Sequence, residues 1–543
     1  MAQDPRAARP AAARPAPILR ARAVALLAAA AVLAGCSAAG SAAPAASGTA
    51  VGGPVLEVES LVLNIGADQS RRNLAWSSAT GEDQYVQLAK AADAAGGAFP
   101  AGVATTVAAT SGGEDGGRHY HDATLAGLEE GTRYLYRVGS DAAGWSRTHA
   151  FTTGDFGAGH AFLLFGDPQI GAGELGTDSA GWASTVRRAT DMFPGTAFLM
   201  SAGDQVNEAS DEAQYAGFLA PGKLAELPLA TTIGNHDAGS EAYDRHFNMP
   251  NSGTARDSRP EGDYWFRYNG ALYINLNSNI EDNAAHAAFV REVIAEQGTD
   301  EQGSGPAWTI VTFHHSVFSV AHHATQAGIL ARREALAPVF SEAGVDVVLM
   351  GHDHVYVRSF LMDGTTPSRD RGELAGDLEP EEGEVLYLTA NSSSASKFYS
   401  IKDRKFAYAA VRNQSKRANF TNVEVTDDVL TLTTYVLSGA AANATVSVLD
   451  RVALSKPDRE APSITAAATA AIARGGGFDP LEGVSASDAR DGDLTAALRV
   501  SGRVLSSIPG EYRLVYAVSD AAGNTTRVLR TVSVAASSWP PRF

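Results

Sequence analysis

The sequence predicts an α/β (α+β) core with an all-β sandwich domain on either side of it. Short apolar runs alternate with helical stretches between His160 and Met350, which is typical of a sheet flanked by helices. Residues 55–153 and 462–534 instead hold short alternating runs separated by Gly and Asp, which is typical of β-sandwiches. The chain has 543 residues, enough for roughly two to four domains, and its composition is that of a folded protein.

The core elements are predicted from hydrophobic period and from turn residues. Its central strands are expected at Ala161–Phe165, Thr196–Ser201, Leu227–Ile233, Trp308–Phe313 and Val345–Met350. The helices between them are expected at Ser179–Phe193, Ala209–Leu219, Asn283–Gln297 and Ile329–Ala343. A hairpin is expected for Tyr264–Tyr268 and Ala271–Leu276, because Asn269-Gly270 separates the two runs. Later strands are expected at Val355–Leu361, Val385–Ala390, Phe420–Val425 and Val429–Val436.

Residues 1–36 have the pattern of a signal peptide. Five arginines accompany the apolar run Ala23–Leu33, which is too short to span a bilayer as a folded helix. The run ends in Leu33-Ala34-Gly35-Cys36, which resembles a bacterial lipoprotein processing box. Cys36 is the only cysteine, and we expect it to be acylated rather than a small buried residue. The protein would then be a lipoprotein on the extracytoplasmic face of a bacterial membrane, or secreted, with residues 37–54 as a flexible tether.

The charge and the single cysteine limit the possible partners and ligands. A formal net charge of −18 argues against nucleic acid as a partner, because binding to its backbone depends on Lys and Arg. With Cys36 assigned to the lipid anchor, no thiolate remains for a metal. Any metal site must therefore be built from His, Asp, Asn, Gln or Glu.

Five predicted strand ends in the core carry residues that can bind metals. In chain order they are Asp167 with Gln169, Asp204 with Asn207, Asn235 with His236, His314 with His315, and His352 with His354. Open α/β sheets build their sites at the carboxyl ends of strands, so these residues are expected to converge. Their number exceeds the four ligands of one tetrahedral zinc, which favours two metals bridged by a carboxylate such as Asp204. The mixed O and N donors suit Fe, Mn or Zn.

As a set, these motifs resemble the calcineurin-like metallophosphoesterases. They are Gly166-Asp167-Pro168-Gln169, Gly203-Asp204, Gly234-Asn235-His236-Asp237, a His after a strand, and Gly351-His352-Asp353-His354. The preceding segment resembles a fibronectin type III domain around Leu128 and Tyr134, and this points to the purple acid phosphatase branch. The resemblance implies a two-layered β-sandwich core flanked by helices. We expect this core at residues 160–455, after the fibronectin-like domain at residues 55–153.

The resemblance also implies the roles of individual residues. The first metal would be held by Asp167, Asp204 and His354, with Gln169 as an uncertain ligand. The second metal would be held by Asp204, Asn235, His314 and His352. The catalytic candidates are His236, which would contact substrate, and His323 as general acid, with His322 as its close rival. Supporting or uncertain roles are expected for Asp237, His315 and Arg358, while Asp353 would fix the turn rather than touch substrate.

Two positions depart from the family pattern. Gln169 stands where many members have a His ligand, and a Gln carbonyl oxygen is a weaker donor. Asn207 stands where the coloured enzymes have a Tyr that ligates ferric iron. We therefore expect a colourless enzyme whose first site is less selective for its metal.

The resulting hypothesis is a surface-anchored phosphoesterase with two metal ions. It would hydrolyse small phosphomonoesters by attack of a metal-bound hydroxide, with a His as general acid. The alternatives are a phosphodiesterase or nucleotidase on the same fold and, from a different class, an inactive surface adhesion protein. Residues 460–537 resemble bacterial Ig-like repeats and could contact the cell envelope. Four acids there could bind Ca²⁺, although we favour solvated turns, and these are Asp488, Asp491, Asp493 and Asp520.

Overall fold

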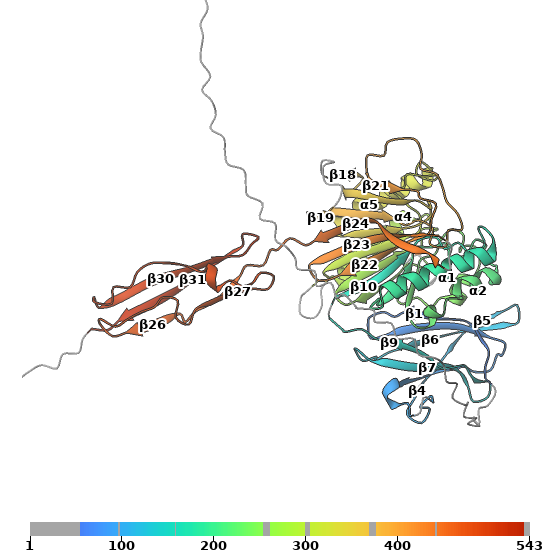
Figure 1. Cartoon of the computed structure of the whole chain (residues 1–543), viewed down its shortest axis with the longest axis horizontal. Helices are drawn as coiled ribbons and strands as arrows, with labels where there is room; N and C mark the ends of the chain where they lie inside the picture. Colours follow the sequence, from blue (N-terminus) through green and yellow to red (C-terminus); the bar gives the residue numbers. More distant parts are fainter. Residues whose placement is uncertain are drawn as a thin grey trace, which may run out of the picture. The chain divides into compact units, whose positions relative to one another are not determined.

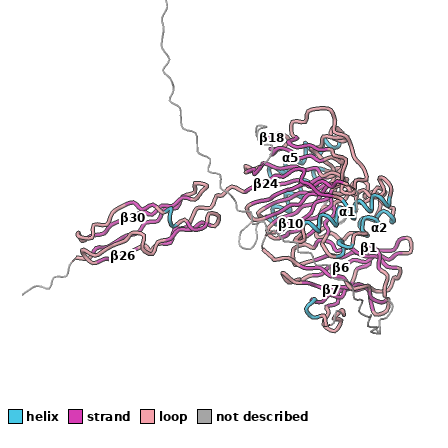
Figure 2. The backbone as a smooth tube through the Cα atoms, viewed as in Figure 1, coloured by secondary structure: helices cyan, strands magenta, loops and turns pink. Residues whose placement is uncertain are grey.

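The computed structural model describes residues 55–95, 98–157, 159–252, 261–298, 305–368, 376–439 and 443–536. The signal peptide, the tether and Cys36 lie outside these residues, so their assignment stays a prediction. Within the described residues, no helix is long and apolar enough to cross a bilayer. Strands account for most of the regular structure, with the helices grouped around the core sheets (Figure 1, Figure 2).

The core consists of two β-sheets. One has eleven strands in the order β19 (Gly376–Leu378), β24 (Thr445–Ser455), β23 (Val429–Ser438), β22 (Asn419–Val425), β10 (His160–Phe165), β11 (Phe198–Ser201), β12 (Leu229–Thr231), β1 (Val58–Ile65), β2 (Arg72–Ser78), β6 (Arg118–Leu125) and β5 (Thr110–Asp115). The other has eight, in the order β13 (Tyr264–Tyr268), β14 (Ala271–Leu276), β15 (Trp308–Phe313), β16 (Val347–Met350), β20 (Glu384–Thr389), β17 (Tyr356–Asp363) and β18 (Thr366–Pro367), with β21 (Ala409–Asn413) paired to β17. Strands β10, β11 and β12 are parallel, and so are β14, β15, β16 and β20. Parallel strands of a sheet bring their carboxyl ends to one edge.

Alternating side chains of the central strands fill separate hydrophobic layers. Phe162 and Leu164 of β10 pack with Tyr273 and Leu349 of the facing sheet, whereas Leu163 points to the opposite side. On that side lie α1 (Leu175–Met192) and α2 (Glu212–Leu219), and the outer face of the eight-stranded sheet is covered by α4 (Asn283–Gln297) and α5 (Ala327–Glu342). The short α3 (Ala242–His246) also joins the first helical layer. These layers confirm the predicted sandwich flanked by helices.

The N-terminal region forms a sandwich that continues into the core. Its second sheet contains β4 (Thr105–Ala108), β3 (Tyr85–Lys90), β7 (Arg133–Ser140), β8 (Gly144–Trp145) and β9 (His149–Thr152). Leu128 and Tyr134 are buried there, and the Tyr134 hydroxyl accepts a hydrogen bond from the Glu129 N–H. Strand β1 pairs in parallel with β12 through Asn64 and Leu229. The backbone hydrogen bonding of the large sheet therefore crosses the predicted domain boundary.

The C-terminal region is a small all-β unit with two sheets. One contains β25 (Ser463–Thr465), β27 (Ser485–Asp488) and β28 (Gly492–Asp493), and the other contains β26 (Thr469–Ile472), β31 (Thr525–Val534), β30 (Gly510–Ser519) and β29 (Arg499–Ser501). A short 3₁₀ turn lies in this unit at Thr495–Ala497, and two others lie earlier in the chain at Ala91–Asp93 and Gly222–Ala225. Leu514, Tyr516 and Val532 form the buried centre of this unit.

Several predicted elements match the structure to the residue, while one long strand was missed. The predicted hairpin, the helix Asn283–Gln297 and the strand Trp308–Phe313 have the observed bounds. Strand β24, by contrast, was not predicted. Its apolar alternation is interrupted by Asp450 and Arg451, and the side chain of Asp450, 8% exposed, pairs with Arg358 of the facing sheet.

Candidate metal centre

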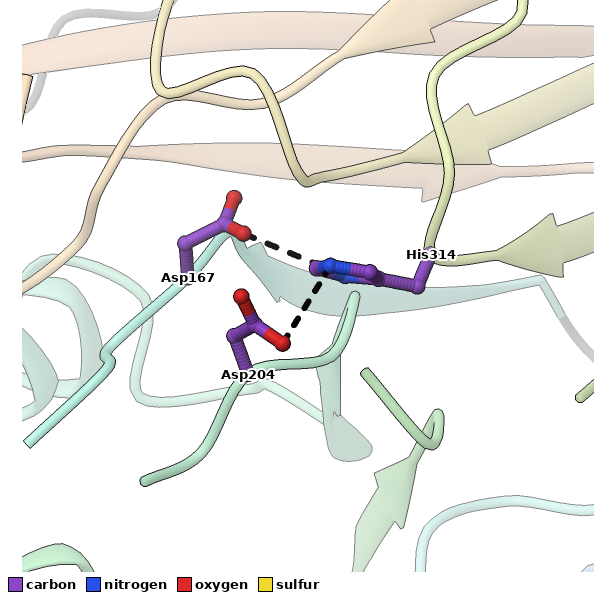
Figure 3. Close-up of side chains that lie close together, drawn as sticks. All are labelled: Asp167, Asp204 and His314. Carbon is purple, nitrogen blue, oxygen red and sulfur yellow. Dashed lines mark ion pairs between the residues drawn. The ribbon is translucent and has the colours of Figure 1, made fainter. Parts of the chain in front are cut away.

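The five strand ends converge from both sheets. In the eleven-stranded sheet, the loops after β10, β11 and β12 carry the Asp, Gln and Asn candidates together with His236. In the eight-stranded sheet, the loops after β15 and β16 carry His314, His315, His352 and His354. Figure 3 shows Asp167, Asp204 and His314 reaching toward one another from these loops. One donor atom of each lies within 4.8 Å of the other two, and all three residues are buried.

The backbone at these strand ends has an uncommon conformation. Asp167, Gln169, Asp204, His352 and His354 all have positive φ angles, between 33° and 74°. Non-glycine residues rarely adopt this region, and such strain concentrates at sites where the surrounding structure over-determines it. The turns therefore aim the candidate side chains at one point at some cost in stability.

Glycines before the candidate residues allow the close approach of the loops. A Cβ atom on Gly234 would lie 2.1 Å from Asp204 Oδ1, and one on Gly203 would lie 2.4 Å from His314 Nδ1. Real Cβ atoms do not approach other atoms so closely, so any side chain here would push the loops apart. This is the physical reason for the glycine that introduces these motifs.

Three of the four residues assigned to the second metal surround a nitrogen of the fourth, His314. His314 Nε2 lies 3.2 Å from Asp204 Oδ1, 3.1 Å from Asn235 Oδ1 and 3.2 Å from His352 Nδ1. His314 Nδ1 donates to the Ala202 carbonyl at 2.9 Å, which leaves Nε2 as the nitrogen available to a ligand. The structure thus brings together all four predicted residues.

The residues assigned to the first metal lie beside this group. His354 Nδ1 donates to the Lys397 carbonyl at 2.9 Å, and His354 Nε2 lies 3.8 Å from Asp167 Oδ1. Asp167 Oδ2 and Gln169 Oε1 are buried and have no hydrogen-bond partner within the described part of the chain. Buried polar atoms are normally paired, so these two unpaired oxygens fit a site for a cation. Together with imidazole nitrogens they make a donor set suited to Fe, Mn or Zn.

The electrostatics of the site also favour a positive charge. Burial raises the pKa of Asp167 despite the neighbouring His314, whereas His314 and His236 overcome burial and lower the pKa of Asp204. Burial alone would lower the pKa of His314, but Asp204 and Asp167 raise it to about 9. Burial lowers the pKa of His354 to about 4, which keeps it in the neutral form that binds metals. Two buried carboxylates thus attract a cation to this point.

Asp237 braces the loops of the eleven-stranded sheet. Its Oδ1 accepts hydrogen bonds from the N–H groups of Gln205 and Val206, and its Oδ2 accepts one from Gly234. Burial, followed by the charge of Asp204, raises the pKa of Asp237 to about 7. Asp237 therefore positions the backbone beside Asp204.

Asn207 and His236 contact each other across the same loops. The Asn207 carbonyl accepts a hydrogen bond from His236 Nδ1 at 2.8 Å, and Asn207 Oδ1 accepts one from Gln169 Nε2 at 3.0 Å. The His236 N–H donates to Asp204 Oδ1 at 2.9 Å. Asn207 thus orients His236 and Gln169, and His236 Nε2 is left without a partner among these contacts.

The adjacent histidines His322 and His323 have different environments. His323 Nδ1 lies 2.7 Å from Asp353 Oδ1, and its ring centroid is 4.1 Å from that of His352. His322 is exposed and stacks on Tyr399. Only His323 of this pair is therefore oriented by a carboxylate next to the candidate ligands.

The remaining two predicted residues have structural partners. His315 Nδ1 lies 2.8 Å from Ser278 Oγ, and its ring lies 4.5 Å from that of His352. Arg358 is 1% exposed and bonds both carboxylate oxygens of Asp450, at 2.6 and 3.2 Å. Arg358 therefore joins β17 to β24 and is not brought to the centre.

The sequence did not predict Tyr399 near the site, and it predicted only part of the role of Asp353. Asp353 was expected only to fix its turn, but it also accepts hydrogen bonds from the His323 N–H and from Ser319 Oγ. Tyr399 was not predicted, and its ring lies 5.2 Å from that of His323 and 5.3 Å from that of His354. Tyr399 sits in a Ser-rich loop with no periodic pattern, so no local signal marks it.

The C-terminal acids form a separate group. Carboxylate oxygens of Asp458, Asp488 and Asp491 lie within 4.8 Å of one another. Asp493 instead accepts a hydrogen bond from the Thr495 N–H, as a turn residue does. Of these three acids, Asp488 is buried, and Asp458 and Asp491 are half-buried.

Three family models match the chain. They are the purple acid phosphatase N-terminal domain at residues 58–153, the calcineurin-like phosphoesterase at residues 160–356, and the bacterial surface Ig-like domain at residues 462–534. A solved purple acid phosphatase, PPD1 from yellow lupin (Lupinus luteus) seeds, has a TM-score of 0.60 at 15% identity over 74% of this chain and 75% of that one. This likeness concerns the fold.

Two curated relatives match parts of the chain. An uncharacterized protein of Mycobacterium tuberculosis is 27% identical over 159 residues, which are 27% of this chain and 30% of that protein. Probable inactive purple acid phosphatase 9 of Arabidopsis thaliana is 22% identical over 296 residues, which are 45% of this chain and 44% of that protein. The chain thus matches less than half the length of either relative.

Proposed function

Because residues 160–356 match the family model of the calcineurin-like phosphoesterases, we propose that this protein hydrolyses phosphate esters, with phosphomonoesters as its main substrates. The observation that carries the proposal is the convergence of buried carboxylates and imidazoles from five strand ends, with Asp204 and His314 in contact at its centre. An ordinary polar surface turn does not explain why strained backbone, glycines with no room for a side chain, and buried oxygens without hydrogen-bond partners occur together at this place.

Two metal ions would occupy the centre. Asp167, Asp204 and His354 would hold the first, with Gln169 as an additional oxygen donor. Asp204, Asn235, His314 and His352 would hold the second, so that Asp204 bridges the pair. When bound, the metals would lower the pKa of a coordinated water and neutralise charge on the phosphoryl oxygens.

We assign the general acid to His323. A protonated imidazole can donate to the leaving oxygen, and the carboxylate of Asp353 at 2.7 Å holds Nδ1 so that Nε2 is free for this task. His322 has no such partner among the contacts described above. His236, in the loop after β12, is anchored through Nδ1 to Asn207, and its Nε2 would bind a phosphoryl oxygen.

Asn207 should make the enzyme colourless. It stands where a coloured relative would have a phenolate ligand, and an amide gives no charge-transfer band with ferric iron. The first site would then accept several metals, including Mn or Zn.

The protein would act outside the cytoplasm. The Ig-like model match at residues 462–534 is consistent with a surface location, and the Leu33–Cys36 box supports a lipid anchor on Cys36. The C-terminal unit would then contact the cell envelope, and the substrate would be a small phosphate ester outside the cell.

Two other functions compete with this one. A phosphodiesterase or nucleotidase would use the same metals and differ in the pocket around them. A non-catalytic adhesion protein is favoured by one relative, whose name calls it probably inactive, and by Gln169 in place of a His. The intact set of the other candidate ligands supports the enzyme.

Metal analysis together with a substrate panel tests the proposal. Purified protein should contain close to two equivalents of transition metal and should cleave p-nitrophenyl phosphate faster than bis(p-nitrophenyl) phosphate. Faster cleavage of the diester would assign the protein to the phosphodiesterases. Less than one equivalent of metal, with no hydrolysis after addition of Mn²⁺ or Fe²⁺ and Zn²⁺, would support the adhesion protein.

A further inference from the structure

A surface pocket of about 300 Å³ lies next to the candidate metal centre. Its lining includes Ser278, Asn279, Glu281, His315, Gln326 and Arg332. His315 forms its boundary with the centre, because the His315 ring lies 4.5 Å from the ring of His352. Asn279 forms a second boundary, since its side chain donates to the carbonyl of Gly234, the residue before Asn235. The pocket is therefore one side chain away from the second predicted metal.

Arg332 gives this pocket a buried positive charge. The residue lies on α5, is 5% exposed, and donates from Nη2 to the Ser278 carbonyl at 2.6 Å. Its Nε is buried and has no hydrogen-bond partner in the described part of the chain. Burial lowers the pKa of Arg332, although arginine stays charged at physiological pH.

Arg332 also lacks the carboxylate partner that the buried Arg358 has. Arg358 bonds both oxygens of Asp450, whereas no carboxylate of the described residues forms an ion pair with Arg332. Glu281 lines the same pocket but is exposed, and it acts on Arg332 only through the longer-range field. A buried charge without a counter-ion is unfavourable, so this arrangement fits an anion supplied from outside.

We propose that this pocket binds an oxyanion of the substrate other than the phosphate that is cleaved. The inference rests on the proposed function and narrows it to phosphate esters that carry a carboxylate or a second phosphate close to the ester bond. The planar guanidinium of Arg332 suits both groups, because it can offer parallel N–H donors to two oxygens. Ser278, Asn279 and Gln326 line the same pocket with hydroxyl and amide groups.

A set of three related substrates tests the inference on the metal-loaded protein. Glycerol 3-phosphate has no second anion, 3-phosphoglycerate adds a carboxylate, and 2,3-bisphosphoglycerate adds a second phosphate. Arg332→Gln should lower kcat/KM by about 10- to 100-fold for at least one of the two anionic substrates, and by less than about threefold for glycerol 3-phosphate. Because 2,3-bisphosphoglycerate carries the carboxylate as well, similar losses for both anionic substrates would identify the carboxylate as the group that Arg332 binds, and a loss confined to 2,3-bisphosphoglycerate would identify the second phosphate.

Two further variants separate binding from structure. Arg291→Gln removes an exposed arginine of α4, which pairs with Glu342, and should leave all three rates unchanged. Glu281→Gln removes the opposing charge at the pocket and should raise kcat/KM for the anionic substrates by roughly two- to fivefold. Because Glu281 is exposed, this variant should fold even if Arg332→Gln does not.

Isothermal titration calorimetry, which measures binding without hydrolysis, separates two outcomes: the pocket does not bind the anion, or the protein is not a phosphoesterase. Binding of 3-phosphoglycerate or 2,3-bisphosphoglycerate that depends on Arg332, without hydrolysis, would support the pocket and refute the enzyme. Equal losses for all three substrates in Arg332→Gln, or no gain in Glu281→Gln, would refute the pocket and leave the phosphoesterase intact.

Discussion

The two sheets contribute different chemistry to the metal centre. The eleven-stranded sheet supplies the oxygen donors Asp167, Gln169, Asp204 and Asn235, which we call the oxygen half. The eight-stranded sheet supplies the imidazoles His314, His352 and His354, which we call the histidine half. The proposed bridging carboxylate, Asp204, would therefore come from the oxygen half, while the histidine half lies next to the candidate general acid His323.

Each half is braced by a buried aspartate, but in a different manner. Asp237 accepts three backbone N–H groups, so the oxygen half is held as a rigid backbone scaffold. Asp353 accepts the backbone N–H of His323 and also the side chains of His323 and Ser319, so in the histidine half it orients a group that can carry a proton. On the proposed function, the oxygen half would fix the metals, and the histidine half would also serve the leaving group.

The largest expected effect comes from the oxygen half. Asp204→Asn keeps the shape of the side chain but removes the charge that would be shared by both metals, so activity should fall by at least about 10²–10³-fold. Metal analysis should show that the protein loses both ions. Asp211→Asn, which keeps a good N-cap on α2, is the matched control and should retain metals and rate. Unchanged metal content in Asp204→Asn would show that it does not bridge.

A smaller and substrate-dependent effect is expected from the histidine half. His323→Ala should lower kcat by about 10²–10³-fold for an alkyl phosphate and much less for p-nitrophenyl phosphate, because a good leaving group needs no proton donor. Metal content should not change. His322→Ala should leave both rates within about twofold of the wild type. If the two variants exchanged these results, the acid would be His322.

The connection between the halves can be broken without touching the metals. Asp450→Ala removes the carboxylate that bonds the buried Arg358 of the facing sheet through both oxygens, and the loss of this buried pair should cost about 3–5 kcal/mol in the free energy of unfolding. Denaturant titration measures this loss, and metal content per folded protein should stay constant. Asp377→Ala breaks the exposed pair with Arg451 and should cost less than about 1 kcal/mol. Equal losses for the two variants would refute the distinction.

The smallest effect is the pH dependence of stability, and it concerns His160 at the start of β10, the end away from the metal centre. His160 Nε2 lies 2.6 Å from the Tyr273 hydroxyl of the facing sheet, and burial lowers the pKa of His160 to about 3. The unfolded chain takes up this proton below a pKa of about 6.5 while the folded protein does not, so stability should decrease as pH falls from 6.5 toward 3.

The variant His160→Phe tests this prediction. The difference in unfolding free energy between pH 7.5 and pH 5.5 should be smaller in the variant than in the wild type by about 1.4 kcal/mol. An identical pH dependence in the two proteins would show that His160 does not link stability to pH.

The sequence alone determined the features that depend on neighbouring residues. A turn after an apolar strand, such as Gly234-Asn235-His236-Asp237, is a local pattern, and so is the 3.6-residue period of Asn283–Gln297. Both were predicted because backbone conformation and hydrophobic period act over a few residues.

Only the tertiary structure decided which side chains meet. His323 and Asp353 are 30 residues apart, and Arg358 and Asp450 are 92 apart. Nothing in the sequence near His322 and His323 distinguishes the two, and nothing near Arg332 shows that it lacks a counter-ion. Such pairings depend on how distant segments pack, because each buried polar group takes whichever partner the fold brings within reach.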